Sequence, residues 1–165
     1  MKEQGYHVRV DNRLLHGQVV QFWLPRLEVD RLVIANDETA EDEALLSVYR
    51  MALDDRIALA VVPVHRLRYE LEEHGEETVF VLLSDICDAA RAEASGVAFP
   101  RLTLGNVHAA PGRERVTDAV YLSAEELAAL MRIRNNGSVV EIQTFPGDTL
   151  RLEADDDGEA RWTRH

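Results

Sequence analysis

Short apolar runs alternate with amphipathic stretches along most of this chain. The continuous apolar runs are typical of buried strands, and we predict strands at residues 7–10, 31–35, 57–62, 78–83, 101–105 and 139–145. Apolar residues at helical spacing predict helices at residues 16–24, 42–51, 64–74, 86–95 and 124–136. Strands that alternate with helices of this length indicate βαβ units. We therefore expect an α/β fold with a mostly parallel sheet and helices on both faces.

Several ends of these elements carry recognisable signals. Ser123 and Glu126 have the spacing of a capping box at the start of the last helix, and Pro25 is expected to end or kink the first helix. One or two short strands are expected within residues 115–122, and an edge strand at 149–153. We predict one domain, residues 1–153, followed by an acidic tail, residues 154–165, that is expected to be frayed.

Composition excludes several classes of protein. The chain has 165 residues, and 30 acidic against 18 basic residues give it a formal net charge of −12. Nucleic acid is not an expected partner, because its phosphates would be repelled. The only lysine, Lys2, argues against a lysine-based phosphate loop, and the only cysteine, Cys87, excludes an internal disulfide. Without a signal peptide or an apolar run of about 18 residues, we expect a cytoplasmic protein with no membrane insertion.

The loop after the first strand carries the most informative chemistry. In α/β sheets, functional groups lie beyond the carboxyl ends of the strands, which here nominates loops 11–16, 36–39, 84–85 and 105–112. The first of these loops leads into a helix whose free N–H groups, from His16, Gly17 and Gln18 onward, favour an anion. Gly17 allows close approach of a bound group, and Arg13 adds a permanently charged fork suited to phosphate oxygens.

His16 lies in the middle of this anion site. An imidazole is a competent nucleophile near neutral pH, so attack on phosphorus would produce a phosphohistidine held by Arg13 and the loop amides. The second ring nitrogen requires an orienting acceptor, for which Asp11, Asp37 and a backbone carbonyl are all candidates.

The residues of this loop resemble a known family. VRVDNRLLHGQVVQFWLPRL, followed by VDRLVIANDETAEDE, is similar to the IIB component of the mannose/fructose/sorbose class of the sugar phosphotransferase system (PTS). LTLGNVHAAPGRERVTDAVYLSAEELAALMRI and NGSVVEIQTFPGD resemble the same family, so the likeness covers about residues 8–148. The sequence departs from the family pattern at Asn12, where many members have Asp, and at Thr103, where Asn is usual. The run Asp155–Asp157 has no counterpart.

The resemblance implies both a fold and a function. The fold would be a doubly wound, largely parallel sheet of about seven strands. His16 would accept a phosphoryl group from a IIA domain and pass it to a sugar bound by the IIC/IID permease, with Arg13 as the arginine of the phosphate loop. Asp11 and residues 36–38 would line the same site. The phosphoryl group would be carried covalently without a cofactor, and the protein would work in the cytoplasm, at most peripheral at the inner face of the membrane.

Other interpretations compete with this one. Arg13 is also compatible with a surface ion pair, and Asp37 with a helix-start acid. His108 is either a contact to the phosphate or a structural loop residue. A metal site built from His16, Asp37 and Asp11 lacks the usual ligand spacing. Two rival functions are a regulatory module that senses phosphorylation state, to which the acidic tail would belong, and a domain that binds a free anion or nucleotide.

Overall fold

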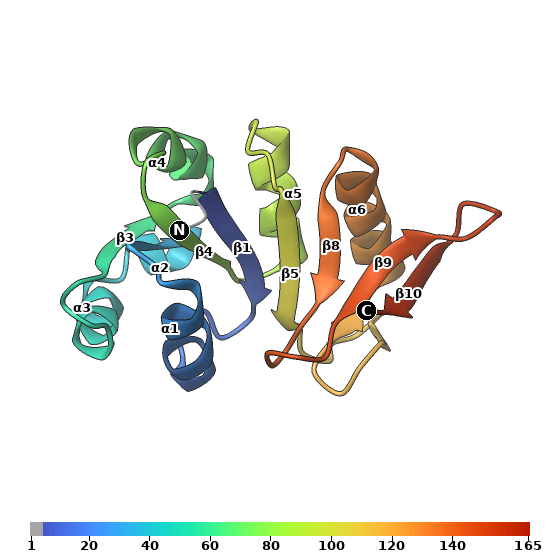
Figure 1. Cartoon of the computed structure of the whole chain (residues 1–165), viewed down its shortest axis with the longest axis horizontal. Coiled ribbons are helices and arrows are strands. Elements are labelled where there is room, and N and C mark those ends of the chain that lie inside the picture. The colour runs from blue at the N-terminus through green and yellow to red at the C-terminus, as the bar shows by residue number, and fades with distance from the viewer. Residues whose placement is uncertain (1–4) are drawn as a thin grey trace.

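A single sheet with helices on its two faces dominates the molecule (Figure 1). The computed structural model describes residues 5–165, so Lys2 lies outside the described residues. The first strand of the chain, β1, lies in the middle of the sheet. The predicted α/β class with a mostly parallel sheet is confirmed.

Eight strands form the main sheet, in the order β10-β9-β8-β5-β1-β4-β2-β3. Their bounds are β1 (Gly5–Asp11), β2 (Arg31–Ala35), β3 (Ala58–Val62), β4 (Thr78–Leu83), β5 (Arg101–Asn106), β8 (Val139–Ile142), β9 (Leu150–Ala154) and β10 (Ala160–Arg164). The strands from β3 to β8 in this order pair in parallel, whereas β9 and β10 are antiparallel to their neighbours. A separate antiparallel pair joins β6 (Glu114–Arg115) and β7 (Tyr121–Leu122). The expected count of about seven strands is therefore one short.

The helical segments largely follow the predicted ranges. They are η1 (Val19–Trp23), α1 (Leu24–Leu27), α2 (Asp37–Ala40), α3 (Glu43–Ala52), η2 (Val64–Arg66), α4 (Leu67–Glu73), α5 (Ile86–Ala94) and α6 (Ala124–Asn135). The capping box of Ser123 and Glu126 is present at the start of α6. Within residues 5–165, no helix has both the length and the apolar character needed to cross a bilayer.

Two hydrophobic cores lie on opposite faces of the sheet. One packs α4, α5 and α6 against the sheet, and the other packs η1, α1 and α3 against the opposite face. Successive side chains of a strand point to opposite faces. Along β1, Val8 and Val10 join the first core, whereas Arg9 between them lies over the ring of Trp23 in the second. A charged residue is thus built into the middle of the sheet.

Pro25 does not end the first helix, so the first of its two expected effects is wrong. The helical run begins at Gly17, has π-helical geometry in η1 and continues through Pro25 to Leu27. Pro25 comes directly after the π-helical segment η1, where the regular i→i−4 hydrogen-bond ladder is already interrupted, so a residue without an N–H is tolerated there.

The C-terminal residues are ordered rather than frayed, which corrects the expectation for residues 154–165. Five residue pairs join β10 to β9 in an antiparallel ladder. The acidic run forms the turn between them, because the Asp155 carboxylate accepts hydrogen bonds from the N–H groups of Asp157 and Glu159, and Gly158 takes a left-handed conformation. Trp162 packs against the first core. Polar sequence here encodes a turn instead of a solvated tail.

Candidate functional site

The candidate site lies where β1 and β5 end side by side in the middle of the sheet (Figure 1). After β1 the chain crosses towards β2 at one side of the sheet, and after β5 it proceeds to β8 at the other. Ligands of open α/β sheets bind at such a switch point. Asp11 ends β1 and Asn106 ends β5, and the two are partners across a shift in register that follows Val10.

A tight turn presents His16 at this edge. The Leu14 N–H donates to the Asp11 carbonyl at 2.9 Å, and the Arg13 N–H donates to Asp11 Oδ1 at 3.1 Å. Leu14 has a φ of 56°, a conformation that costs a non-glycine residue of order 1–3 kcal/mol. The buried side chains of Leu14 and Leu15 hold the turn against the second core. The loop is therefore fixed by its own hydrogen bonds and by packing.

Asp11 orients the imidazole of His16. Its carboxylate is fully buried, and Oδ2 lies 2.9 Å from His16 Nε2 while accepting a hydrogen bond from Asn106 Nδ2 at 2.8 Å. Because a carboxylate only accepts hydrogen bonds, this contact requires a proton on Nε2, so that in the neutral ring the lone pair is on Nδ1. No partner of Nδ1 is recorded among residues 5–165. Of the three candidate orienting groups, Asp11 occupies the position.

Arg13 lies beside the carboxylate and remains accessible. Its side chain is 43% exposed, and its Nε is 4.0 Å from Asp11 Oδ1. One terminal nitrogen donates to Gln18 Oε1 at 3.1 Å, so Gln18 braces the guanidinium. The helix begins with a bond from the Val20 N–H to the His16 carbonyl, and no acceptor is recorded for the N–H groups of Gly17 and Gln18 in the described part of the chain. These donors fit the predicted anion site.

Gly17 is not required by the protein's own packing. A Cβ at this position would meet no atom within 4 Å, and the backbone φ is not positive. The space beside residue 17 is therefore open to whatever approaches His16 from outside.

Asp37, one of the three candidates for the group that orients His16, lies elsewhere. Its carboxylate accepts hydrogen bonds from the Val64 N–H and from Arg91, each at 2.9 Å. These bonds, the Val64 bond foremost, hold the pKa of Asp37 below its usual value. The physical reason is strand order: Asp37 follows β2, and β4 separates β2 from β1. The acids of this loop belong to a neighbouring polar network.

Four further residues lie at or next to the site. Asn12 joins three strand-end loops, because its amide donates to the Ser84 carbonyl at 2.8 Å and its carbonyl oxygen accepts the His108 N–H. The aspartate that many family members have at this position could not donate a hydrogen bond to the Ser84 carbonyl. The asparagine of this chain therefore adds a link between two loops. His108 contributes its backbone while its side chain is exposed. Asn106 and Arg9 were not predicted, although a charge inside the apolar run of residues 7–10 was a signal.

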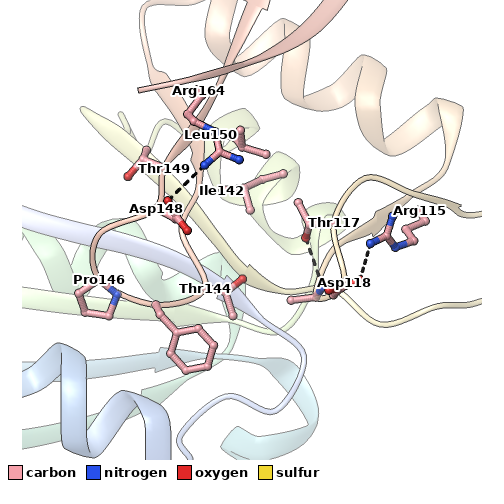
Figure 2. Close-up of a pocket in the computed structure, with 12 residues that line it drawn as sticks. Arg115, Thr117, Asp118, Ile142, Thr144, Pro146, Asp148, Thr149, Leu150 and Arg164 are labelled. Carbon is pink, nitrogen blue, oxygen red and sulfur yellow. Dashed lines mark hydrogen bonds and ion pairs between the residues drawn. The ribbon is translucent and has the colours of Figure 1, made fainter.

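A pocket lies beyond the end of β8. It has a volume of about 460 Å³ and is lined by Ile142, residues 144–146, residues 148–150, Arg115, residues 117–119 and Arg164. Figure 2 shows its charged residues paired with one another, Asp148 with Arg164 and Arg115 with Asp118. None of the predicted site residues lines it. The pocket adjoins the site through Thr144, whose carbonyl accepts a hydrogen bond from Arg9, and through Phe145, whose ring meets that of Phe22.

One group of potential metal ligands occurs among residues 5–165. It consists of Glu70, Glu73 and His74, whose ligand atoms lie within 4.8 Å of one another. The group lies on and next to α4 and contains none of the predicted site residues. The hypothetical metal site of His16, Asp37 and Asp11 is not assembled, since Asp37 pairs with Arg91.

Comparison with known proteins gives a consistent result. The family model described as "PTS system sorbose subfamily IIB component" matches residues 6–154. The sorbose-specific EIIB component of Klebsiella pneumoniae is 28% identical over 142 residues, covering 85% of this chain and 87% of that protein. The mannose-specific EIIAB component of Escherichia coli is 25% identical over 85% of this chain, and the match covers 44% of that longer protein.

Solved structures agree in fold. The crystal structure of the IIBSor domain of the sorbose permease from Klebsiella pneumoniae aligns with a TM-score of 0.78 and 26% identity, covering 86% of this chain and 88% of that one. The crystal structure of manxB from Thermoanaerobacter tengcongensis aligns with a TM-score of 0.77 and 28% identity, covering 90% and 94%.

Proposed function

The chain belongs to the sorbose subfamily of IIB components of the phosphotransferase system, and we propose that it carries a phosphoryl group on His16. The group would come from a IIA domain and pass to a sugar bound by a IIC/IID permease. The observation that carries the proposal is the hydrogen bond of 2.9 Å between His16 Nε2 and Asp11, which leaves Nδ1 with a lone pair. The side chain of His16 is 13% exposed, so a partner has access only to part of the ring.

The geometry supports nucleophilic attack by Nδ1. The N–P bond forms on Nδ1 as the bond between phosphorus and the donor's nitrogen breaks. The ring then carries positive charge, which the buried Asp11 carboxylate stabilises through Nε2. Arg13 and the N–H groups of Gly17 and Gln18 hold the phosphoryl oxygens. In the second step a sugar hydroxyl oxygen attacks phosphorus, the N–P bond breaks, the hydroxyl proton is released and His16 returns to its neutral form.

An exposed aromatic pair supports contact with a partner at this face. Phe22 of η1 and Phe145 are 45% and 51% exposed, and their rings meet edge to face with centroids 6.2 Å apart. The IIA and permease contacts must both be transient, for which interfaces near or below about 1,200–1,600 Å² are typical. The net charge of −12 favours partners with basic residues around their own site. The protein would act in the cytoplasm, at the inner face of the membrane when it meets the permease.

The proposal is tested by mapping the modified residue. The chain is incubated with a phosphoenolpyruvate-driven donor series that ends in a IIA domain, and intact and peptide masses are measured at alkaline pH. We expect one acid-labile, base-stable phosphoryl group on His16 that is absent from His16→Ala and retained in the control His108→Ala. Equal labelling of His16→Ala would refute the proposal. Transfer of the label to a sugar requires addition of membranes containing the permease.

The regulatory alternative rested on the acidic run as a feature available to another protein. These acids form the exposed turn of the β9–β10 hairpin rather than a frayed tail, and they stay accessible there. We propose the carrier role because the Asp11–His16 contact and the family both support it, and a free anion or nucleotide would give no covalent label in the same experiment.

A further inference from the structure

A buried arginine lies behind the candidate nucleophile. Arg9 is 1% exposed, and its two terminal nitrogens donate to the backbone carbonyls of Gln143 at 2.7 Å and Thr144 at 3.2 Å. Its guanidinium carbon lies 4.6 Å from the centre of the Trp23 ring. The remaining nitrogen, Nε, is buried without a hydrogen bond and lies 3.7 Å from Asp11 Oδ2. Two carbonyls and the Trp23 ring therefore hold the guanidinium in place, and its Nε faces the Asp11 carboxylate.

The surrounding chain makes room for this charge. A Cβ at residue 105 would lie 2.1 Å from a terminal nitrogen of Arg9, so glycine is required there by the guanidinium. Burial lowers the pKa of Arg9 to about 10, so the group remains charged at neutral pH. An arginine in a core is expensive, and a well-packed apolar residue is often as stable or more stable at such a position.

Only a few charges face the Asp11–His16 pair. Arg9 from β1 and Arg13 from the loop both lie within 4.0 Å of the carboxylate, while Asn106 from β5 and Gln18 from the first helix are neutral. Arg13 is 43% exposed, so water screens it, whereas Arg9 is screened little. Arg9 is thus the principal counter-charge of a buried carboxylate that touches the imidazole.

From this arrangement we propose that Arg9 is a positioning residue for phosphoryl transfer. Its positive charge offsets the negative charge of Asp11. The carboxylate can then accept the hydrogen bond from the Nε2–H of His16 without favouring protonation of Nδ1. Without this counter-charge, the Asp11–His16 pair takes up a proton at higher pH, and protonated Nδ1 has no lone pair for phosphorus. The inference rests on the proposed role of His16.

The test compares Arg9→Met and Arg9→Lys with wild type in phosphoryl transfer from phosphoramidate, a donor that needs no partner protein. The initial rate of each protein is measured between pH 5.5 and 8.5. For Arg9→Met we expect the pH at which the rate is half of its maximum to be about one unit higher than in wild type. At high pH the rate should return nearly to that of wild type. Arg9→Lys should shift this midpoint less. Arg161→Met, which removes an exposed charge on β10, should leave the profile unchanged.

Two further measurements keep the inference falsifiable. Gly105→Ala leaves every charge in place but displaces the guanidinium, and should give a smaller shift in the same direction. The ¹⁵N chemical shifts of His16 report the ring proton directly and should show protonation of Nδ1 at higher pH in Arg9→Met. A uniform loss of rate at all pH values with an unchanged midpoint would overturn the inference. If wild type is not labelled at His16, the proposed function fails, while the ¹⁵N titration still tests the counter-charge.

Discussion

Replacing Asp11 with asparagine tests the central contact of the site. Three donors reach this carboxylate: His16 Nε2 and Asn106 Nδ2 at one oxygen, and the Arg13 N–H at the other. The asparagine side chain of Asp11→Asn has one oxygen and one NH₂ group. The NH₂ group must therefore face a hydrogen-bond donor, either His16 and Asn106 or the Arg13 N–H. If the NH₂ group faces His16, the ring takes the other tautomer and Nδ1 loses its lone pair.

The expected magnitude follows from burial. Asp11 and Arg9 are 0% and 1% exposed, and breaking a buried charge pair by removing one partner costs about 3–5 kcal/mol. We expect the free energy of unfolding to fall by that amount. Loss of the oriented imidazole should slow phosphoryl transfer by about 10²–10⁴-fold.

The assay combines urea unfolding with labelling from phosphoramidate and from the IIA donor, under conditions in which near-ultraviolet circular dichroism shows the variant folded. Asp148→Asn serves as the control, because this carboxylate is 96% exposed and lies outside the site. A folded Asp11→Asn protein that is labelled within threefold of the wild-type rate would refute the assignment of Asp11 as the orienting group.

Three other predictions follow from the same structure. Arg13→Ala should slow transfer about 10²–10³-fold with little change in melting temperature, since the side chain is 43% exposed, and wild-type kinetics in this variant would contradict its role. Phe22→Ala should raise KM for the IIA donor while leaving labelling by phosphoramidate unchanged, and equal effects on both donors would exclude a docking role. Burial acts to raise the pKa of Glu141, but hydrogen bonds from Arg101 and Arg151 outweigh it and leave that pKa below its usual value. The ionised Glu141 therefore stabilises the fold at pH values above the pKa of an ordinary glutamate. This stabilisation is lost as the pH falls through the lowered pKa of Glu141 in the folded protein. In Glu141→Gln the free energy of unfolding, measured with urea, should fall less steeply with decreasing pH below about pH 4.5 than in wild type. An equal slope in the two proteins would contradict the pairing of Glu141 with the two arginines.

Sequence periodicity was sufficient for the elements that alternate regularly. The parallel strands and most helix ends follow from apolar runs and capping residues such as Ser123, because these signals are local. The C-terminal strand was missed because Asp155 and Gly158 were interpreted as a solvated charge run. The apolar side chains of the alternating residues 160–164 were too few to outweigh that composition.

The candidate site was predicted only in part, and strand order explains the difference. Asp11, Arg13 and His16 belong to one short loop, so their proximity follows from sequence spacing. Asp37 follows β2 and Asn106 ends β5, and the sequence alone does not tell which strand lies next to β1. Because β5 rather than β2 is that neighbour, Asn106 joins the site and Asp37 does not.

The central position of β1 has a consequence for the newly made protein. The ribosome synthesises His16 early, but Asn106 is 95 residues from Asp11 and the carbonyl that Arg9 binds at Gln143 is 134 residues away in sequence. Contacts of such separation form late, after loop closure has brought distant segments together. A nascent chain that ends before β8 contains His16, Asp11 and Asn106 but lacks the carbonyls of Gln143 and Thr144 that hold Arg9. Chemical labelling of His16 is therefore a kinetic probe for the last stage of folding.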